Sequence, residues 1–223
     1  MPFKPAGDGN TLAAAAVGVV LAGGASRRMG SDKARLILGG ASLAAAAAVR
    51  LAAVCSEVAM ADGGRGVLAG LPSLPDGPGS GPAAGILGAA AAYPDRPLLV
   101  LACDLPRVPV ALLAELVRTP ISDWTVPRWR GGIEPLCALY GPVSLAALAE
   151  QVGRGLLAPH RLAEDGRLTV RFLDGDRLAR FGPPEEVFLN LNTPEELERY
   201  ASTSAGTSPQ RPQGQISRRK SKR

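Results

Sequence analysis

A short apolar run that passes directly into a glycine-rich loop places the tightest limit on how this chain can fold. Residues 17–22 read Val-Gly-Val-Val-Leu-Ala, and Gly23 and Gly24 follow at once. A continuous apolar run of this length is typical of a strand buried on both faces, as in a parallel sheet covered by helices. Paired glycines let the backbone turn sharply and approach a ligand closely. The sequence therefore predicts a central strand that feeds a ligand-binding loop.

Apolar runs of strand length alternate with helical segments along the rest of the chain. Further strands are predicted at residues 57–61, 97–103, 124–129, 135–140 and 168–173. Helices are predicted at residues 43–54, 83–93, 109–117, 143–152 and 194–200, with a Gly- and Pro-rich loop at 63–81. Strands that alternate with helices form a mostly parallel sheet, so we expect an α/β, Rossmann-like three-layer domain with a mostly parallel central sheet.

The two ends of the chain are predicted to lie outside this domain. We expect a flexible N-terminal extension at residues 1–15, the folded domain at 16–200 and a disordered basic tail at 201–223. Six Arg and Lys residues between positions 211 and 223 account for more than the whole net charge of +5. The folded part is therefore close to neutral, and nucleic acid is not an expected partner.

Composition argues against several classes of protein. The three cysteines are scattered, which predicts buried, reduced thiols and neither a disulfide framework nor a zinc site. No apolar run reaches the roughly 18 residues of a membrane span, and the run at 12–22 lacks the flanks of a signal peptide. We therefore expect a cytoplasmic protein without a membrane partner. His160 is the only histidine, which argues against a hydrolase that depends on a histidine base.

The loop after the first strand carries positive charge as well as glycine. Arg27, Arg28 and Lys33 follow Gly23 and Gly24 within ten residues. Backbone N–H groups of such a loop can cradle phosphate, and Arg and Lys side chains bind phosphate oxygens. The spacing matches neither the Walker motif nor the dinucleotide-binding motif. The alternative is an ordinary strand-to-helix turn with solvated arginines.

A carboxylate stands at the end of the second strongly predicted strand. Asp104 follows the apolar run at 97–103 directly. A hard oxygen ligand at this place suits Mg²⁺ bound to a polyphosphate, whereas the alternative role is a helix cap. In open α/β sheets, ligands bind beyond the carboxyl ends of the strands, so we expect residues 21–33 and Asp104 to form one site.

Five segments, in order along the chain, resemble the motifs of the MobA-type molybdenum-cofactor guanylyltransferases, a family within the larger group of Rossmann-like nucleotidyltransferases. The segments are residues 21–33, Asp76 together with 81–85, 103–106, 134–140 and 188–197. The resemblance covers about residues 17 to 200. It implies that the protein transfers GMP from GTP to molybdopterin and releases pyrophosphate, with Mg²⁺ as cofactor. It also implies contacts with other proteins of molybdenum cofactor biosynthesis or with molybdoenzymes.

The resemblance also implies roles for individual residues. The implied catalytic residues are Arg27, Lys33 and Asp104, with Asp104 as the metal ligand. The implied nucleotide-binding residues are Leu21, Ala22, Gly23, Lys33, Asp76 and Asp104. The implied acceptor-binding residues are Gly81, Gly85, Asn190 and Asn192. For Asp76 the alternative is a plain turn residue, and for the two asparagines it is a turn before the last helix.

Two features bear on base and acceptor. Gly23 stands where related cytidylyltransferases tend to have Ala, which favours a purine nucleotide. Ala61 stands where the family usually has Asn, and the neighbouring Asp62 could replace that group only after a local shift. Arg154, Arg161 and Arg167 are all candidates for the acceptor phosphate. The alternatives are therefore a nucleotidyltransferase that uses CTP or another phosphorylated acceptor, and a non-catalytic nucleotide-binding member of the family.

Overall fold

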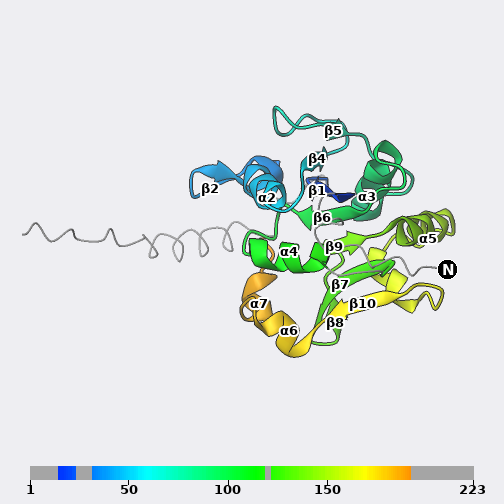
Figure 1. Cartoon of the computed structure of the whole chain (residues 1–223). Helices are drawn as coiled ribbons and strands as arrows, with labels where there is room; N and C mark the ends of the chain where they lie inside the picture. Colours follow the sequence, from blue (N-terminus) through cyan, green and yellow to red (C-terminus); the bar gives the residue numbers. More distant parts are fainter. Residues whose placement is uncertain (1–14, 24–31, 119–121, 192–223) are drawn as a thin grey trace, which may run out of the picture.

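A mostly parallel sheet forms the centre of the protein (Figure 1). The computed structural model describes residues 15–23, 32–118 and 122–191. Within these residues the main sheet has the strand order β10-β7-β9-β6-β1-β4-β5, with β8 paired to β7. The strands are β1 (Val17–Leu21), β4 (Glu57–Ala61), β5 (Ser73–Leu74), β6 (Leu98–Ala102), β7 (Trp124–Trp129), β8 (Gly132–Ile133), β9 (Cys137–Tyr140) and β10 (Val170–Leu173). Only β8 and β9 pair antiparallel to their neighbours in this sheet, which confirms the predicted fold class.

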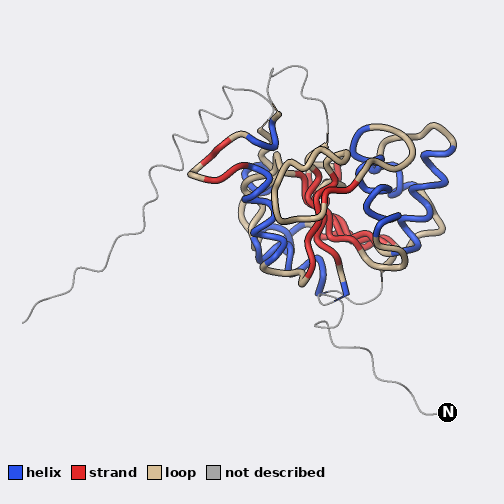
Figure 2. The backbone as a smooth tube through the Cα atoms, turned by 90° about the horizontal axis from the view of Figure 1, so that it is seen from above, coloured by secondary structure: helices blue, strands red, loops and turns tan. Residues whose placement is uncertain are grey.

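Helices cover both faces of the sheet and give three layers (Figures 1 and 2). Helices α2 (Leu43–Ala52) and α4 (Val110–Arg118) lie on one face, and α3 (Gly81–Ala92) and α5 (Pro142–Gly153) lie on the other. The β2–β3 hairpin (Ile37–Leu38 and Ala41–Ser42) projects beside α2. The Ser42 side chain accepts a hydrogen bond from the Ala45 N–H and so caps the N-terminus of α2.

The strand order places the chain's switch point at β1. The chain passes from β1 to β4 on one side and later to β6 on the other, and both neighbours run parallel to β1. Leu21, the last residue of β1, pairs in register with Ala61 at the end of β4 and with Ala102 at the end of β6. Three carboxyl ends therefore meet at one edge of the sheet, which is where open α/β sheets bind ligands.

Close packing of glycines fixes α3 against the loop that follows β5. A Cβ atom at Gly88 would lie 2.0 Å from the Pro75 carbonyl oxygen, and one at Gly77 would lie 2.7 Å from the Gly88 nitrogen. The Gly77 N–H also donates to the Ala84 carbonyl at 2.8 Å. Only glycine permits so close an approach of loop and helix. The loop that carries Asp76 is thereby held on the first two turns of α3.

Several elements differ from the sequence prediction. The stretch 63–81 is not loop throughout, because Ser73–Leu74 forms β5 by pairing with the end of β4, and α3 begins at Gly81. The strand predicted at 135–140 begins at Cys137. The short helices α6 (Gly175–Ala179) and α7 (Pro184–Val187) and the 3-10 turns at Lys33–Arg35 and Pro159–Glu164 were not predicted. Each is too short to show a helical period.

Some predictions lie outside the described residues. These are the helix at 194–200, the residues Arg27, Arg28 and Asn192, and the two chain ends. The three cysteines are buried and free, as expected. Among the described residues, no helix has the length and apolar character needed to cross a bilayer.

Candidate active site

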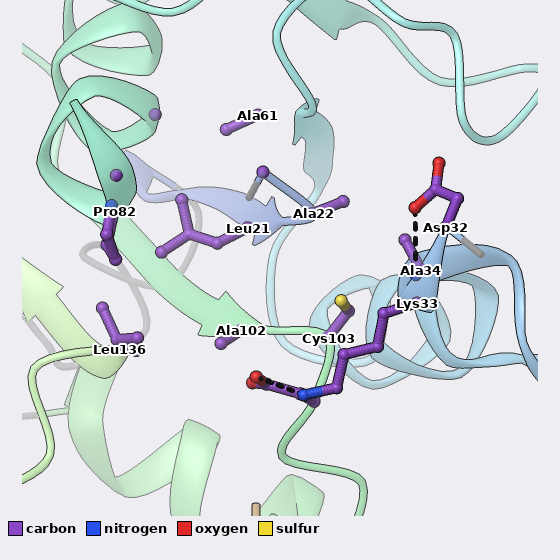
Figure 3. A pocket seen from close by; sticks show the side chains of 14 residues that line it. Leu21, Ala22, Asp32, Lys33, Ala34, Ala61, Pro82, Ala102, Cys103 and Leu136 are labelled. Atoms are coloured by element: carbon purple, nitrogen blue, oxygen red, sulfur yellow. Dashed lines mark hydrogen bonds and ion pairs between the residues drawn. The ribbon is translucent and has the colours of Figure 1, made fainter. Parts of the chain in front are cut away.

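The three strand ends at the switch point line a pocket of about 250 Å³ (Figure 3). Residues 21–23, Ala61 and residues 102–104 come from the ends of β1, β4 and β6. Residues 32–34 enclose a second side, and Gly81, Pro82 and Gly85 bring in the first turns of α3. Leu136 closes the pocket from the segment before β9. The fold therefore brings the end of the strand before the glycine loop next to Asp104, as predicted.

An ion pair lies in the wall of this pocket. The Lys33 ammonium lies 3.0 Å from Asp104 Oδ2, and this contact is the dashed line at the end of the Lys33 side chain in Figure 3. The two side chains are only 14% and 22% exposed. The same ammonium donates to the Asn190 side-chain oxygen at 3.5 Å. Residues from three distant parts of the sequence thus meet at one charged centre.

The other oxygen of Asp104 has no such partner. Asp104 Oδ1 is buried and accepts no hydrogen bond from the described residues. A buried carboxylate oxygen without a partner is costly, and a cation would satisfy it. Among the described residues, no three His, Cys, Asp or Glu side chains are grouped to form a metal cage. The arrangement therefore fits a hard cation that takes one protein carboxylate and completes its shell from a bound polyphosphate and water.

Burial, with a smaller contribution from the charge of Asp104, raises the pKa of two groups near this carboxylate. The pKa of Glu134 is raised to about 7, mainly by burial and further by the charge of Asp104. The pKa of the Cys103 thiol is raised to about 12 for the same two reasons, in the same order. Both shifts oppose further negative charge beside Asp104.

Asp76 and Gly85 lie together at the β4 side of the pocket. A Cβ at Gly85 would lie 3.2 Å from Leu21 Cδ2, 3.5 Å from Ala61 Cβ and 3.9 Å from Asp76 Oδ1. Asp76 itself is exposed. The absence of a side chain at Gly85 thus leaves space between Leu21, Ala61 and the Asp76 carboxylate. Gly81, which has a φ of +64°, also has open space around its missing side chain.

The structure answers the question raised by Ala61 and Asp62. Asp62 is fully buried, and its carboxylate accepts hydrogen bonds from the Val67 N–H at 2.7 Å and the Ser73 hydroxyl at 2.6 Å. These bonds hold the loop after β4. Because both oxygens of Asp62 are used in this way, its carboxylate does not substitute for the family's Asn. At the Ala61 position the pocket wall is apolar.

The three candidate arginines for an acceptor phosphate lie elsewhere. Arg154, Arg161 and Arg167 line a separate pocket between α5 and the 3-10 turn at 159–164, which shares no residue with the strand-end pocket. Each already pairs with a carboxylate there. Arg65 was not among the predicted site residues, yet its guanidinium donates to the Ala22 carbonyl and to Asp32 Oδ2 beside the strand-end pocket. No motif indicated it, since its place depends on the turn after β4.

Comparison with known proteins places these features in a family. The MobA-like NTP transferase domain family matches residues 18–165. A molybdenum cofactor guanylyltransferase from Cereibacter sphaeroides is 40% identical over 194 residues, which cover 83% of this chain and 95% of the relative. A probable molybdenum cofactor guanylyltransferase from Chloroflexus aggregans is 33% identical over 81% of this chain and 91% of its own. The crystal structure of molybdopterin-guanine dinucleotide biosynthesis protein A from Archaeoglobus fulgidus superposes with a TM-score of 0.73 at 23% identity, over 86% of this chain and 100% of that one.

Proposed function

Because this chain belongs to the MobA-like NTP transferase family and within it to the molybdenum cofactor guanylyltransferases, we propose that it transfers GMP from GTP to molybdopterin, the Mo-molybdopterin cofactor. The products are the guanine dinucleotide cofactor and pyrophosphate. One structural observation carries the proposal more than any other. The Lys33–Asp104 pair, with one carboxylate oxygen unsatisfied, stands at the meeting point of three parallel strand ends.

The nucleotide is proposed to lie along the end of β1. Leu21, Ala22 and Gly23 offer backbone groups to the base and sugar, and Asp76 contacts the nucleotide from the opposite loop. A Cβ at Gly23 would meet only the Ala61 carbonyl, at 3.7 Å. An added methyl group would therefore fit without a clash but would occupy pocket space, which supports the use of this space for the larger purine ring.

The cation is proposed to be Mg²⁺, held by Asp104. Its unsatisfied Oδ1 is a hard oxygen ligand of the kind that Mg²⁺ prefers. When bound, such an ion neutralises phosphate charge during nucleotidyl transfer. Lys33, already 3.0 Å from Oδ2, is placed to neutralise charge on the same phosphates. Arg27, proposed as a further catalytic cation, lies outside the described residues.

The acceptor is proposed to enter beside α3. Gly81 and Gly85 give open space along the first turns of this helix, and both line the pocket. Asn190 accepts a hydrogen bond from the Lys33 ammonium, which supports a role for its amide in acceptor binding. Asn192, its proposed partner in acceptor binding, lies outside the described residues. An acceptor phosphate is ionised at neutral pH, so alignment and charge neutralisation are enough and no strong general base is needed. Binding to other molybdenum cofactor proteins or to molybdoenzymes remains a prediction from the resemblance.

Pyrophosphate release with Mg²⁺ and molybdopterin, compared among GTP, CTP, ATP and UTP, tests this proposal. Release that requires both molybdopterin and GTP is the expected result. Preference for CTP would keep the chemistry and overturn the choice of base, with Ala61 the first residue to exchange for Asn. Absence of release with all four nucleotides would favour a non-catalytic nucleotide-binding protein.

The variant Asp104→Asn is the matching negative control for this assay. It removes the charge of the proposed metal ligand but keeps its shape, and we expect a loss of about 10³-fold in kcat/KM. Asp95→Asn makes the same chemical change at a surface turn with a φ of +58°, which Asn tolerates well, and should retain activity. Equal activity of the two variants would remove Asp104 from the mechanism.

A further inference from the structure

One guanidinium beside the strand-end pocket ties together two segments that the nucleotide must contact. Arg65 Nη2 donates to the carbonyl of Ala22, the residue after β1. Its Nη1 donates to Asp32 Oδ2 at 2.9 Å. Asp32 in turn caps the 3-10 turn that carries Lys33, because its Oδ1 accepts from the Ala34 N–H at 3.2 Å. A single planar side chain thus links the end of β1 with the turn that carries Lys33.

The turn that presents Arg65 is itself rigidly anchored. The buried Asp62 carboxylate binds the Val67 N–H and the Ser73 hydroxyl, and Gly64 N–H donates to the Leu74 carbonyl at 2.9 Å. Gly63, Gly64 and Gly66 have φ values of +67°, +74° and +59°, which side-chain-bearing residues rarely adopt. Three glycines and one buried carboxylate therefore determine the shape of this turn.

The guanidinium of Arg65 makes one hydrogen bond within that turn and two to other segments. Its Nε donates to the Asp62 carbonyl at 2.7 Å, which orients the guanidinium, and the two Nη atoms reach the other two segments. Because the turn has its own anchors, the bonds to the other two segments are not needed to hold it. An arginine fork can hold two acceptors in fixed relative positions, which a single ammonium cannot do.

We propose that Arg65 is a positioning residue that fixes Lys33 relative to the end of β1, and so sets the width of the nucleotide site. This inference rests on the proposed function, in which Ala22 and Lys33 bind opposite parts of the nucleoside triphosphate. With the guanidinium in place, the two contacts are pre-arranged before the nucleotide binds. Without it, part of the binding energy must order the two segments.

Arg35 provides a matched control. Its Nε lies 3.6 Å from the same Asp32 Oδ2, and its Nη2 donates to the Gly66 carbonyl at 3.3 Å. Its side chain is 56% exposed. The change Arg35→Ala therefore removes the same charge from the same carboxylate without removing the link to Ala22. Any difference between the two variants reports the link and not the charge.

The experiment compares Arg65→Ala, Arg65→Lys and Arg35→Ala in the full chain, by kinetics and by amide hydrogen exchange. For Arg65→Ala we expect KM for GTP to rise about tenfold, with a much smaller change in kcat, since a charged hydrogen bond to a positioning group is lost. The KM of Arg65→Lys should lie between those of the wild type and Arg65→Ala, because an ammonium can keep the ion pair with Asp32 but cannot also reach the Ala22 carbonyl. Arg35→Ala should change KM by less than about twofold.

Hydrogen exchange of the nucleotide-free proteins separates this inference from the proposed reaction. Peptides covering residues 17–23 and 32–38 should exchange faster in Arg65→Ala than in the wild type and in Arg35→Ala. If the wild type released no pyrophosphate, the proposed function would fail, yet the exchange comparison would still decide the role of Arg65. Equal exchange and equal KM for Arg65→Ala and Arg35→Ala would overturn the inference. If Arg65→Ala failed to fold, Arg65→Lys with wild-type KM and exchange would overturn it equally.

Discussion

Two charged pockets among the described residues differ in how their charges are paired. The pocket beside α5 is larger, at about 480 Å³, and is lined by Glu150, Arg154, Arg161, Glu164, Asp165 and Arg167. These residues pair with one another, and the Arg167 guanidinium lowers the pKa of Asp165 to about 2. The strand-end pocket has few charges, but Asp104 keeps one buried oxygen unsatisfied. Incomplete satisfaction at converging strand ends, and not the number of charges, identifies the candidate site.

The largest expected effect comes from removing the Lys33 ammonium from the strand-end pocket. Lys33→Met keeps most of the side-chain volume but removes the ammonium from Asp104 and Asn190. We expect kcat/KM for GTP to fall by about 10³-fold, because charge neutralisation on the phosphates is lost. The free energy of unfolding should fall by only about 1–2 kcal/mol, measured by urea denaturation, since Asp104 loses its ion pair.

Arg167→Met is the counterpart in the other pocket. It removes more contacts, to both Glu150 and Asp165, from a side chain that is 61% exposed. We expect kcat/KM to stay within about twofold of the wild type, because these exposed pairs contribute little. If Arg167→Met impaired the reaction as strongly as Lys33→Met, the acceptor phosphate would bind beside α5, and the contrast between the pockets would be wrong.

A smaller effect is expected from the packing that supports each pocket. Gly88→Ala places a methyl group 2.0 Å from the Pro75 carbonyl, so α3 and the Asp76 loop must move apart. We expect a loss of about 3 kcal/mol in the free energy of unfolding, together with a higher KM for GTP. Gly153→Ala, at the end of α5 beside the other pocket, meets no atom within 4 Å. It should leave stability unchanged or slightly raised, because Ala favours the helix. A Gly88→Ala protein as stable as Gly153→Ala would show that the loop can shift freely.

The same contrast explains what could be predicted from the sequence. Asp104 directly follows the apolar run at 97–103, and Lys33 lies in the segment after the apolar run at 17–22, so their meeting at the strand ends followed from chain order and the rules for parallel sheets. Arg65 lies in a turn shaped by buried hydrogen bonds of Asp62, and β5 exists only by pairing with β4, so neither has a periodic pattern of its own. The pairing of Arg167 with Glu150, seventeen positions away, likewise depends on the tertiary fold.

A pH dependence of stability is expected from Glu134, and it tests whether this side chain lies in the negative field of Asp104. Burial and the Asp104 charge raise the pKa of Glu134 to about 7, against about 4.3 for Glu in an unfolded chain. Between these two pH values the folded protein keeps a proton that the unfolded chain has already released. This contribution to stability is therefore present at low pH and is lost as the pH rises toward 7.

Glu134→Gln keeps the oxygen that accepts from the Leu136 N–H but cannot ionise. In EDTA, we expect it to match the wild type near pH 4 and to be more stable by about 3–4 kcal/mol at pH 8, since each pKa unit corresponds to about 1.4 kcal/mol. Glu164→Gln, in a side chain that is 72% exposed beside the other pocket, should show no such difference between the two pH values. Equal pH profiles for wild type and Glu134→Gln would mean that Glu134 is better solvated than its burial indicates, and the negative field assigned to Asp104 would lose its support.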